Sequence, residues 1–342
     1  LSGSQTASNI TSSQTYNLTC TGTTKNVSAA VNVVVALPPP PPPPPQPVVG
    51  LVVQRHMGTF DAAGQAFTNE LGAHSIRVGY NHGDHDLVVK WAAQNGKSVL
   101  FMLGYGSGCN PTTVSGRQCY ADRSANLAQE YGSKVEYYEV WNEWNGGIGL
   151  GCGWGQAGTA CTDAVMYTDL LCRTHKAIKA VQPNAIIVGG VTAGADTGFI
   201  SKMLNAGAGN CMDMVSVHPY VYTQTKFSVP YNSSASVGVN KFVEAVTAVH
   251  DLVKQKTGKS MPVLASEDGR TDKLQSSNEQ LTADYLTELY NRASSIPFLE
   301  GIWWYALEDT SKGRWSPAGY GLLRSNNTKK PAFAAYQAAA NK

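Results

Sequence analysis

The stretch that decides the fold is residues 135–145, which read Val-Glu-Tyr-Tyr-Glu-Val-Trp-Asn-Glu-Trp-Asn. The β-branched and aromatic residues at its start predict a buried strand over 135–141. This strand leads into Asn142 and Glu143, which stand between Trp141 and Trp144. Apolar walls around a carboxyl group favour its neutral, protonated form. The stretch therefore indicates a general acid at Glu143; the alternative is a glutamate that caps the next helix or pairs with an arginine.

Apolar runs of similar length recur along the rest of the chain and alternate with segments of helical periodicity. The other strands are expected at 48–53, 75–78, 98–103, 185–188, 214–218, 262–266 and 301–306, and helices at 87–94, 124–131, 163–181, 239–257 and 279–293. Eight strands with intervening helices predict an α/β protein with a (β/α)8 TIM barrel over residues 48–342. A doubly wound open sheet is the rival, but no Gly-x-Gly-x-x-Gly motif follows the first strand. The glycine-rich run 104–108 leads into Cys109-Asn110-Pro111 and is interpreted as a loop.

Two further segments precede the predicted barrel. Residues 1–37 alternate short β-type runs with Ser, Thr and Gly, and residues 38–47 are almost entirely proline. The proline run predicts a stiff polyproline II spacer of roughly 25 Å, at about 3.1 Å per residue; a ligand for an SH3-type domain is the alternative. The run from Tyr16 to Cys20 resembles the C-terminal part of bacterial immunoglobulin-like domains, so 1–37 is expected to be a partial domain of that kind.

The charge balance restricts the class of partner. With 26 basic and 24 acidic residues the formal net charge is +2, and no basic cluster alternates with aromatic residues. This composition argues against nucleic acid and anionic membranes as partners. The 16 tyrosines and 7 tryptophans suit the apolar faces of sugars. No hydrophobic run approaches the length of a membrane span, and we expect a monomer that binds a polysaccharide or oligosaccharide.

The cysteines indicate an oxidising compartment. Two local pairs lie in glycine-rich segments predicted as loops, namely Cys109 with Cys119 and Cys152 with Cys161, and each pair predicts a disulfide. Cys172 and Cys211 form either a third disulfide or buried free thiols, and Cys20 is left over. Their spacing matches no zinc site. We therefore expect a mature chain that is secreted, periplasmic or held at the cell surface.

Polar and aromatic residues follow nearly every predicted strand. In a barrel the carboxyl ends of the strands form the working face, so these side chains are expected to converge. They are Arg77, Tyr80, Tyr105, Asn142, Glu143, His218, Tyr220, Glu267, Trp303, Trp304 and Tyr305.

Glu143 and Glu267 both end short apolar strands, three strands apart. Two carboxyl groups at one barrel mouth are what glycosidic bond cleavage requires, one protonated to donate to the leaving oxygen and one ionised to attack carbon. Arg77 on the second strand is expected to hold Glu267 ionised. The alternative is two unrelated helix-capping glutamates.

Four motifs resemble the clan A glycoside hydrolases, most closely families 39 and 5. They are Trp141-Asn142-Glu143, His218-Pro219-Tyr220, Ser266-Glu267 and the pair Trp303-Trp304. The resemblance implies a retaining double displacement with Glu143 as acid/base and Glu267 as nucleophile. It also implies that Asn142 binds the sugar 2-hydroxyl, that Arg77 and Tyr220 orient the nucleophile, and that His218 lines the cleft. One of Trp303 and Trp304 would floor the reacting subsite, and alternation allows only one of them to point inward.

The chain departs from the clan at Trp144, where proline usually follows the acid glutamate. Trp144 is either a platform for the leaving group or a surface aromatic packed under the glycine-rich loop.

Two other signals are weak. Residues 82–86, His-Gly-Asp-His-Asp, have metal-binding residue types, but their spacing fits a solvated loop better, and we predict neither a catalytic metal nor a cofactor. Ser107 lacks a Gly-x-Ser-x-Gly elbow, which leaves a serine esterase as a weak second reading.

The function expected from the sequence is a secreted retaining β-glycoside hydrolase that acts within a polysaccharide. An exo-acting β-glycosidase is the alternative within this class. A non-catalytic carbohydrate-binding barrel is the alternative outside it, and the presence of both glutamates argues against it.

Overall fold

The computed structural model describes residues 14–21, 23–33, 46–53, 60–81, 83–106, 108–150, 162–222, 226–273, 278–309 and 319–342. The chain divides into two units, Leu1–Pro45 and Gln46–Lys342. In the first, strands β1 (Gln14–Thr21) and β2 (Asn26–Val33) form an antiparallel hairpin in which Thr21 lies opposite Asn26. The immunoglobulin-like assignment and the predicted domain boundaries stay predictions.

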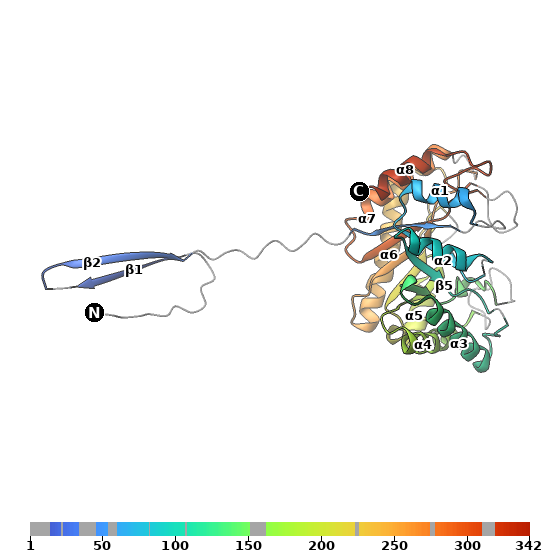
Figure 1. Cartoon of the computed structure of the whole chain (residues 1–342), viewed down its shortest axis with the longest axis horizontal. Coiled ribbons are helices and arrows are strands. Elements are labelled where there is room, and N and C mark those ends of the chain that lie inside the picture. Colours follow the sequence, from blue (N-terminus) through green and yellow to red (C-terminus); the bar gives the residue numbers. More distant parts are fainter. Residues whose placement is uncertain are drawn as a thin grey trace. The chain divides into compact units, whose positions relative to one another are not determined.

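The second unit is a closed barrel of parallel strands, which confirms the predicted (β/α)8 fold (Figure 1). Its strands follow one another around the barrel in chain order, and the last pairs with the first. They are β3 (Val48–Val52), β4 (Ser75–Gly79), β5 (Ser98–Met102), β6 (Tyr137–Glu139), β7 (Ile186–Ala193), β8 (Met214–His218), β9 (Val263–Asp268) and β10 (Leu299–Trp304).

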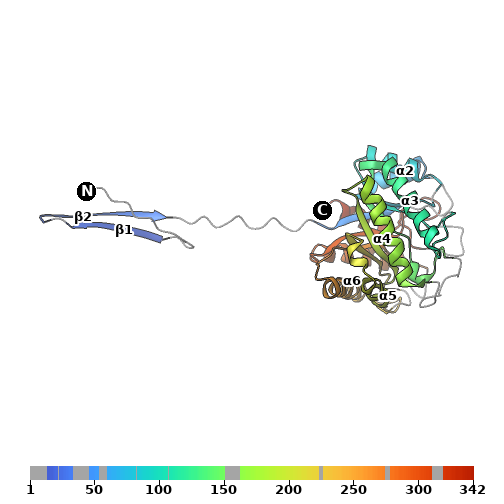
Figure 2. The ribbon, with the colours of Figure 1, turned by 90° about the horizontal axis from the view of Figure 1, so that it is seen from below.

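Helices alternate with these strands and lie on the outside of the sheet, as Figures 1 and 2 show. They are α1 (Ala62–Leu71), α2 (His85–Gln94), α3 (Val114–Tyr131), α4 (Ala164–Val181), α5 (Thr197–Asn205), α6 (Ala235–Thr257), α7 (Glu279–Ala293) and α8 (Pro331–Ala340). Side-chain caps fix several starts: Asp163 accepts from the backbone N–H of Met166, and Asn278 from that of Leu281. Gly72 and Gly258 end α1 and α6 in the left-handed conformation.

The structure corrects three local predictions. Strand β6 is shorter than the predicted 135–141, because the chain leaves the sheet after Glu139. Helix α3 begins at Val114 rather than at 124, since Thr113 accepts a hydrogen bond from the Gly116 N–H, and Cys119 therefore lies in a helix and not in a loop. His85 and Asp86 likewise open helix α2 instead of lying in a loop.

Two apolar layers hold the barrel together. The larger fills the space between strands and helices, and the smaller fills the barrel itself. Trp303 belongs to the inner layer and Trp304 to the outer layer, where it packs near Tyr285 of α7. The indole of Trp303 occupies the space next to Gly50, where the Cβ of any other residue would collide with it. The side-chain direction of these two tryptophans is thereby settled.

A bulge in β9 changes the direction of the last side chains of that strand. Ala265 pairs with Ile302 but Asp268 pairs with Trp304, so β9 has one more residue than β10 over this interval. Strict alternation from Leu264, which points into the barrel, would turn Asp268 inward and Glu267 outward. With the extra residue, Glu267 faces the barrel mouth and Asp268 faces helix α7.

Disulfides join Cys109 to Cys119 and Cys172 to Cys211, with Cα–Cα distances of 5.6 and 4.8 Å. The first confirms a predicted pair, and the second settles the open alternative in favour of a bond. Cys152, Cys161 and the side chain of Cys20 lie outside the described residues.

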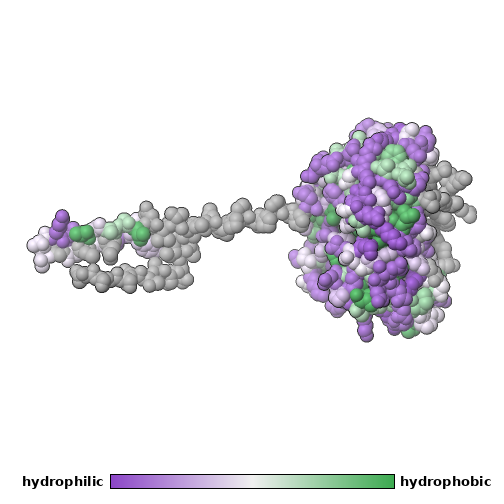
Figure 3. Space-filling model, viewed as in Figure 1, coloured by the Kyte–Doolittle hydropathy of each residue, from purple (hydrophilic) through white to green (hydrophobic). Residues whose placement is uncertain are grey.

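The surface of the barrel unit seen in Figure 3 is mostly hydrophilic, with small separate hydrophobic areas. Among the helices that the structure describes, none combines the length and the apolar character needed to cross a bilayer.

Candidate active site

The backbone around Glu143 turns sharply and places its carboxyl group in the barrel mouth. Trp141 and Glu143 have positive φ angles of 70° and 51°, so the chain abandons the strand geometry immediately after β6. The Glu143 N–H donates to the carbonyl oxygen of Val191 at 2.8 Å, which ties this turn to the neighbouring strand β7. Oε1 of Glu143 lies 2.8 Å from Nδ1 of His218.

The tryptophans beside Glu143 do not form the predicted walls. Trp141 and Trp144 have no exposed surface and pack against each other in the outer layer, at a ring-centroid distance of 5.0 Å. Trp144 also contacts Tyr167 of α4. Both rings belong to the apolar layer between strands and helices, and the ring of Trp141 also lies 5.7 Å from that of Tyr105. The roles predicted for Trp144, as a leaving-group platform or a surface aromatic, are therefore both wrong.

Glu267 is held from two sides at the opposite wall of the mouth. Nη1 of Arg77 donates to its Oε1, and the hydroxyl of Tyr220 donates to its Oε2 at 2.8 Å. Its Oε2 also lies 3.7 Å from Nδ1 of His218. The structure thus brings together Glu267, Arg77 and Tyr220, the nucleophile and the two orienting residues expected from the sequence.

Arg77 links the site to a buried carboxylate that the sequence analysis missed. Its Nε donates to Oε2 of Glu139 at 2.5 Å, and its Nη2 donates to Oδ1 of Asn142 at 2.8 Å. Glu139 is fully buried on β6, two residues after Tyr137, whose side chain also points into the barrel. Side chains alternate between the two faces of a strand, so the sequence could have placed Glu139 on the same face as Tyr137. The guanidinium therefore has three fixed partners and one orientation.

The charges around the site keep Glu267 ionised. Burial alone raises the pKa of this carboxyl, but the positive charges of His218 and Arg77, together with hydrogen bonds from Tyr220 and Arg77, hold it below its ordinary value. Burial lowers the pKa of His218, yet the two glutamates outweigh it and raise the pKa. The imidazole is therefore stabilised in its charged form, between two carboxyl groups.

His218 is fully buried and oriented on both sides. Its Nε2 lies 3.1 Å from Oγ of Ser266, and that hydroxyl lies 2.6 Å from Oγ of Ser216. All three side chains point into the barrel from β8 and β9. Below Glu143 and Glu267 the barrel interior is therefore polar, and it becomes apolar only at the level of Trp303.

Tyrosines surround the mouth where a tryptophan was expected. Asn142 Nδ2 donates to the hydroxyl oxygen of Tyr105 at 3.3 Å, and the rings of Tyr220, Tyr305 and Tyr320 meet edge to face at centroid distances of 5.8 to 6.2 Å. Tyr320 was missed by the sequence analysis because it follows β10 by many residues. Burial, followed by the charges of Glu143 and Glu267, raises the pKa of Tyr105 to about 12.

The predicted tryptophan floor is wrong. Trp303 points inward, but it is fully buried, and its Nε1 donates to Oγ of Ser75 at 3.2 Å. Ser75 begins β4, two residues before Arg77, so this ring lies deeper in the barrel than the site. Trp304 points outward. Tyr305, the residue directly after β10, is only partly buried and packs against Tyr220 and Tyr320 at the mouth.

The two glutamates are close enough to act on one bond. Glu143, His218 and Glu267 each offer one side-chain nitrogen or oxygen, and these atoms lie within 4.8 Å of one another. The same three atoms could in principle be metal ligands, although Nδ1 of His218 already contacts Glu143. The residues at 84–86 have protein partners as well: Asp84 accepts from the Phe60 N–H, and Nδ1 of His85 lies 2.7 Å from the Tyr131 hydroxyl.

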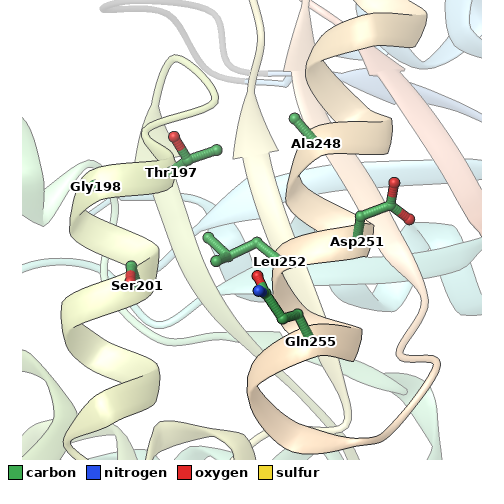
Figure 4. A pocket seen from close by; sticks show the side chains of 7 residues that line it. All are labelled: Thr197, Gly198, Ser201, Ala248, Asp251, Leu252 and Gln255. Carbon is green, nitrogen blue, oxygen red and sulfur yellow. The ribbon is translucent and has the colours of Figure 1, made fainter.

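A separate shallow groove of about 590 Å³ lies on the outside of the barrel, between α5 and α6 (Figure 4). Its lining includes Ser201, Asp251, Leu252 and Gln255, and none of the residues described above takes part in it.

Comparison with known proteins reveals similarity of fold. No protein-family model and no curated protein matches the chain. Among solved structures, it is similar to a family 39 glycoside hydrolase from Bacteroides cellulosilyticus, with a TM-score of 0.65, 21% identity, and 97% of this chain and 71% of that chain covered. The chain is also similar to a monomeric β-xylosidase from Caulobacter crescentus, with a TM-score of 0.61 and 19% identity. This match covers 86% of this chain and 68% of the β-xylosidase. A β-glucuronidase from Bacteroides uniformis matches with a TM-score of 0.62 and 16% identity. This match covers 86% of this chain and 35% of the β-glucuronidase.

Proposed function

We propose that the protein is a retaining β-glycoside hydrolase. The observation that carries this proposal is the placement of Glu143 and Glu267, whose carboxyl oxygens approach within 4.8 Å across the mouth of a parallel barrel. In retaining enzymes the two carboxyl groups are about 5 to 5.5 Å apart, whereas inverting enzymes leave roughly 6.5 to 9.5 Å for a water molecule. The names of the similar structures, a glycoside hydrolase, a β-xylosidase and a β-glucuronidase, support the same class.

The contacts of Glu267 support its role as the nucleophile, with Glu143 as the acid/base. Glu267 is kept ionised by Arg77 and Tyr220, which suits a nucleophile. Its carboxylate attacks the anomeric carbon while Glu143 gives its proton to the glycosidic oxygen; the bond to the leaving group breaks and a glycosyl ester forms. Glu143 then takes a proton from water, the water oxygen attacks the anomeric carbon, and Glu267 leaves as a carboxylate. Both residues return to their starting states.

Other residues have supporting roles in this proposal. Asn142 is held by Arg77 and contacts Tyr105, a position from which its amide can reach the 2-hydroxyl of the reacting sugar. His218 lies between the two carboxyl groups, and Tyr305 offers an aromatic edge at the rim.

The choice between endo and exo action rests on the loops. We infer endo action on an exopolysaccharide or a cell-wall β-glycan, because the connection after β5 is tied by the Cys109–Cys119 disulfide and can form a cleft wall. The exo-acting alternative is favoured by the names of two similar structures, a β-xylosidase and a β-glucuronidase. Two disulfides support an extracytoplasmic location.

The test is product analysis with the full chain and its Glu267→Gln variant as the blank. The substrates are 4-nitrophenyl β-xyloside, β-glucoside, β-mannoside and β-glucuronide, with β-linked plant, fungal and bacterial polysaccharides. Release by the wild type alone, with the β-anomer appearing first by NMR, supports retention. First appearance of the α-anomer contradicts retention, and binding of a glycan by both proteins without release supports the carbohydrate-binding barrel.

A further inference from the structure

Asp268 directly follows the proposed nucleophile and has no role in the chemistry described so far. Its side chain is completely buried on the outer face of β9. The bulge in that strand turns it away from the mouth, so it cannot touch a bound sugar. A buried carboxyl group needs hydrogen-bond partners, and those of Asp268 lead back to the site.

The first partner is the backbone of Tyr220. Oδ1 of Asp268 accepts from the Tyr220 N–H at 3.1 Å. Tyr220 has a φ of 37°, a left-handed conformation that a residue with a large side chain adopts only when its surroundings impose it. The same residue directs its hydroxyl to Oε2 of Glu267 at 2.8 Å. The hydrogen bond from Asp268 is thus one of the constraints on the backbone that aims this hydroxyl.

The second partner anchors Asp268 to the helical layer. Oδ2 accepts from the hydroxyl of Tyr285 at 2.8 Å, and Tyr285 is fully buried on α7. The carbonyl oxygen of Asp268 also accepts from the backbone N–H of Tyr305 at 2.8 Å. Asp268 therefore connects α7, the segment after β8 and the end of β10 to the strand that bears Glu267.

We propose that Asp268, anchored by Tyr285, is a positioning residue that holds Tyr220 in the backbone conformation in which its hydroxyl reaches Glu267. The inference rests on the proposed function, in which Glu267 is the nucleophile. The groups that face Glu267 are Arg77, Tyr105, Glu143, His218 and Tyr220. Of these, Tyr220 donates a hydrogen bond to Asp268, and His218 interacts with Asp268 through its charge.

The environment of Asp268 opposes the ionised form of its carboxyl group. Burial raises the pKa of Asp268 to about 7, although the hydrogen bonds from Tyr285 and from the N–H groups of Gly269 and Tyr220 lower it. The surrounding titratable side chains that interact with it are Tyr222, His218, Tyr285, Tyr290 and Tyr320.

A double-mutant cycle in the full chain tests the positioning role. Asp268→Ala should lower kcat/KM about 10- to 100-fold, the usual effect of losing a hydrogen bond to a charged group. It should also move the acid limb of the pH profile to higher pH, because the Tyr220 hydroxyl lowers the pKa of Glu267. In a Tyr220→Phe background the same substitution should cost less than about threefold, since the hydroxyl to be positioned is absent. Equal losses in both backgrounds would show that Asp268 acts independently of the Tyr220 hydroxyl and would overturn the proposal.

Three further measurements keep the outcome decisive. Asp268→Asn retains an acceptor for the Tyr220 N–H and should recover most of the activity. Asp213→Asn is the matched control. Asp213 directly precedes β8, at the end of that strand far from His218, and its Oδ2 accepts from the Ile187 N–H at 2.8 Å, so the substitution should leave kcat/KM unchanged. If Asp268→Ala does not fold, Tyr285→Phe replaces it, with an effect in the same direction.

A crystal structure of the Asp268→Ala or Tyr285→Phe variant separates this inference from the proposed function. The Tyr220 hydroxyl should lie beyond hydrogen-bond distance of Glu267, and an unchanged 2.8 Å contact would overturn the positioning role whether or not a substrate is found. Absence of turnover by the wild type would contradict the proposed function alone.

Discussion

Nδ1 of His218 lies 2.8 Å from Oε1 of Glu143, and the imidazole is wholly buried in the floor of the barrel mouth. The same nitrogen is 3.7 Å from Glu267, so one ring lies between the two carboxyl groups. Burial lowers the pKa of His218, but Glu267 and Glu143 outweigh burial and raise it, so the ring supplies positive charge beside the carboxylate of Glu267.

Removal of this imidazole should change the pH dependence of the proposed glycoside hydrolysis. His218 lowers the pKa of Glu267, so in His218→Ala that pKa rises and the acid limb of kcat/KM moves to higher pH. The measurement is a pH profile with the best aryl glycoside. His175→Ala on α4 is the control and should leave the profile unchanged. An acid limb at the same pH in His218→Ala would contradict the electrostatic role.

The two glutamates should differ in their dependence on the leaving group. Glu267→Ala should abolish turnover of every substrate, because no glycosyl ester can form. Glu143→Ala should retain activity on 4-nitrophenyl glycosides and lose it on alkyl glycosides, since only the poor leaving group needs a proton. Rates on both substrate types decide the matter, and equal losses in the two variants on both types would count against these roles.

Arg77 should not be replaceable by lysine. Its guanidinium contacts Glu139, Asn142 and Glu267 at once, and an ammonium group cannot reproduce this geometry. Arg77→Lys should reduce kcat/KM by about 10- to 100-fold and lower Tm, because Glu139 is left in a buried site with its ion pair weakened. Arg173→Lys, which alters a surface pair with Asp169, is the matched control. Activity of Arg77→Lys within twofold of the wild type would contradict the expectation.

The pKa of Asp268 predicts a pH-dependent stability. Its pKa of about 7 in the folded protein exceeds the ordinary aspartate value of 3.8, so the folded state binds the extra proton between these limits. Its contribution to stability is therefore largest below about pH 4, declines as the pH rises, and levels off above 7. Asp268→Asn removes this titration, and its stability relative to the wild type should rise between pH 4 and 7, by an amount on the order of a few kcal/mol. Urea unfolding at several pH values measures this, and a constant difference would refute it.

The two disulfides should contribute unequally to stability. Cys172 and Cys211 are 39 residues apart and Cys109 and Cys119 only 10, and a longer closed loop restricts the unfolded chain more. Replacing both cysteines by serine should cost about 4 kcal/mol for the first pair and about 3 kcal/mol for the second. Thermal unfolding of the two double variants, with and without reductant, gives the order. A larger loss for the Cys109–Cys119 pair would show that strain or local packing outweighs chain entropy.

The sequence by itself determined the architecture and the composition of the mouth. Short apolar runs alternating with helical periodicity predict the barrel, and a barrel requires that residues following its parallel strands meet at one end. Arg77, Glu143, His218, Tyr220 and Glu267 were placed together on that ground, and the structure brings them into contact. The strand period was also sufficient to show that only one of Trp303 and Trp304 points inward.

Only the tertiary structure decided which way the decisive side chains point. The left-handed turn at Trp141 directs its indole to the outer layer, and the bulge in β9 exchanges the faces of Glu267 and Asp268. Both departures depend on hydrogen bonds to neighbouring strands or helices that are remote in sequence, such as those of Glu143 with Val191 and of Asp268 with Tyr285. A local pattern records propensity and period, but the direction of a side chain after a turn or bulge is fixed by partners that only the closed barrel supplies.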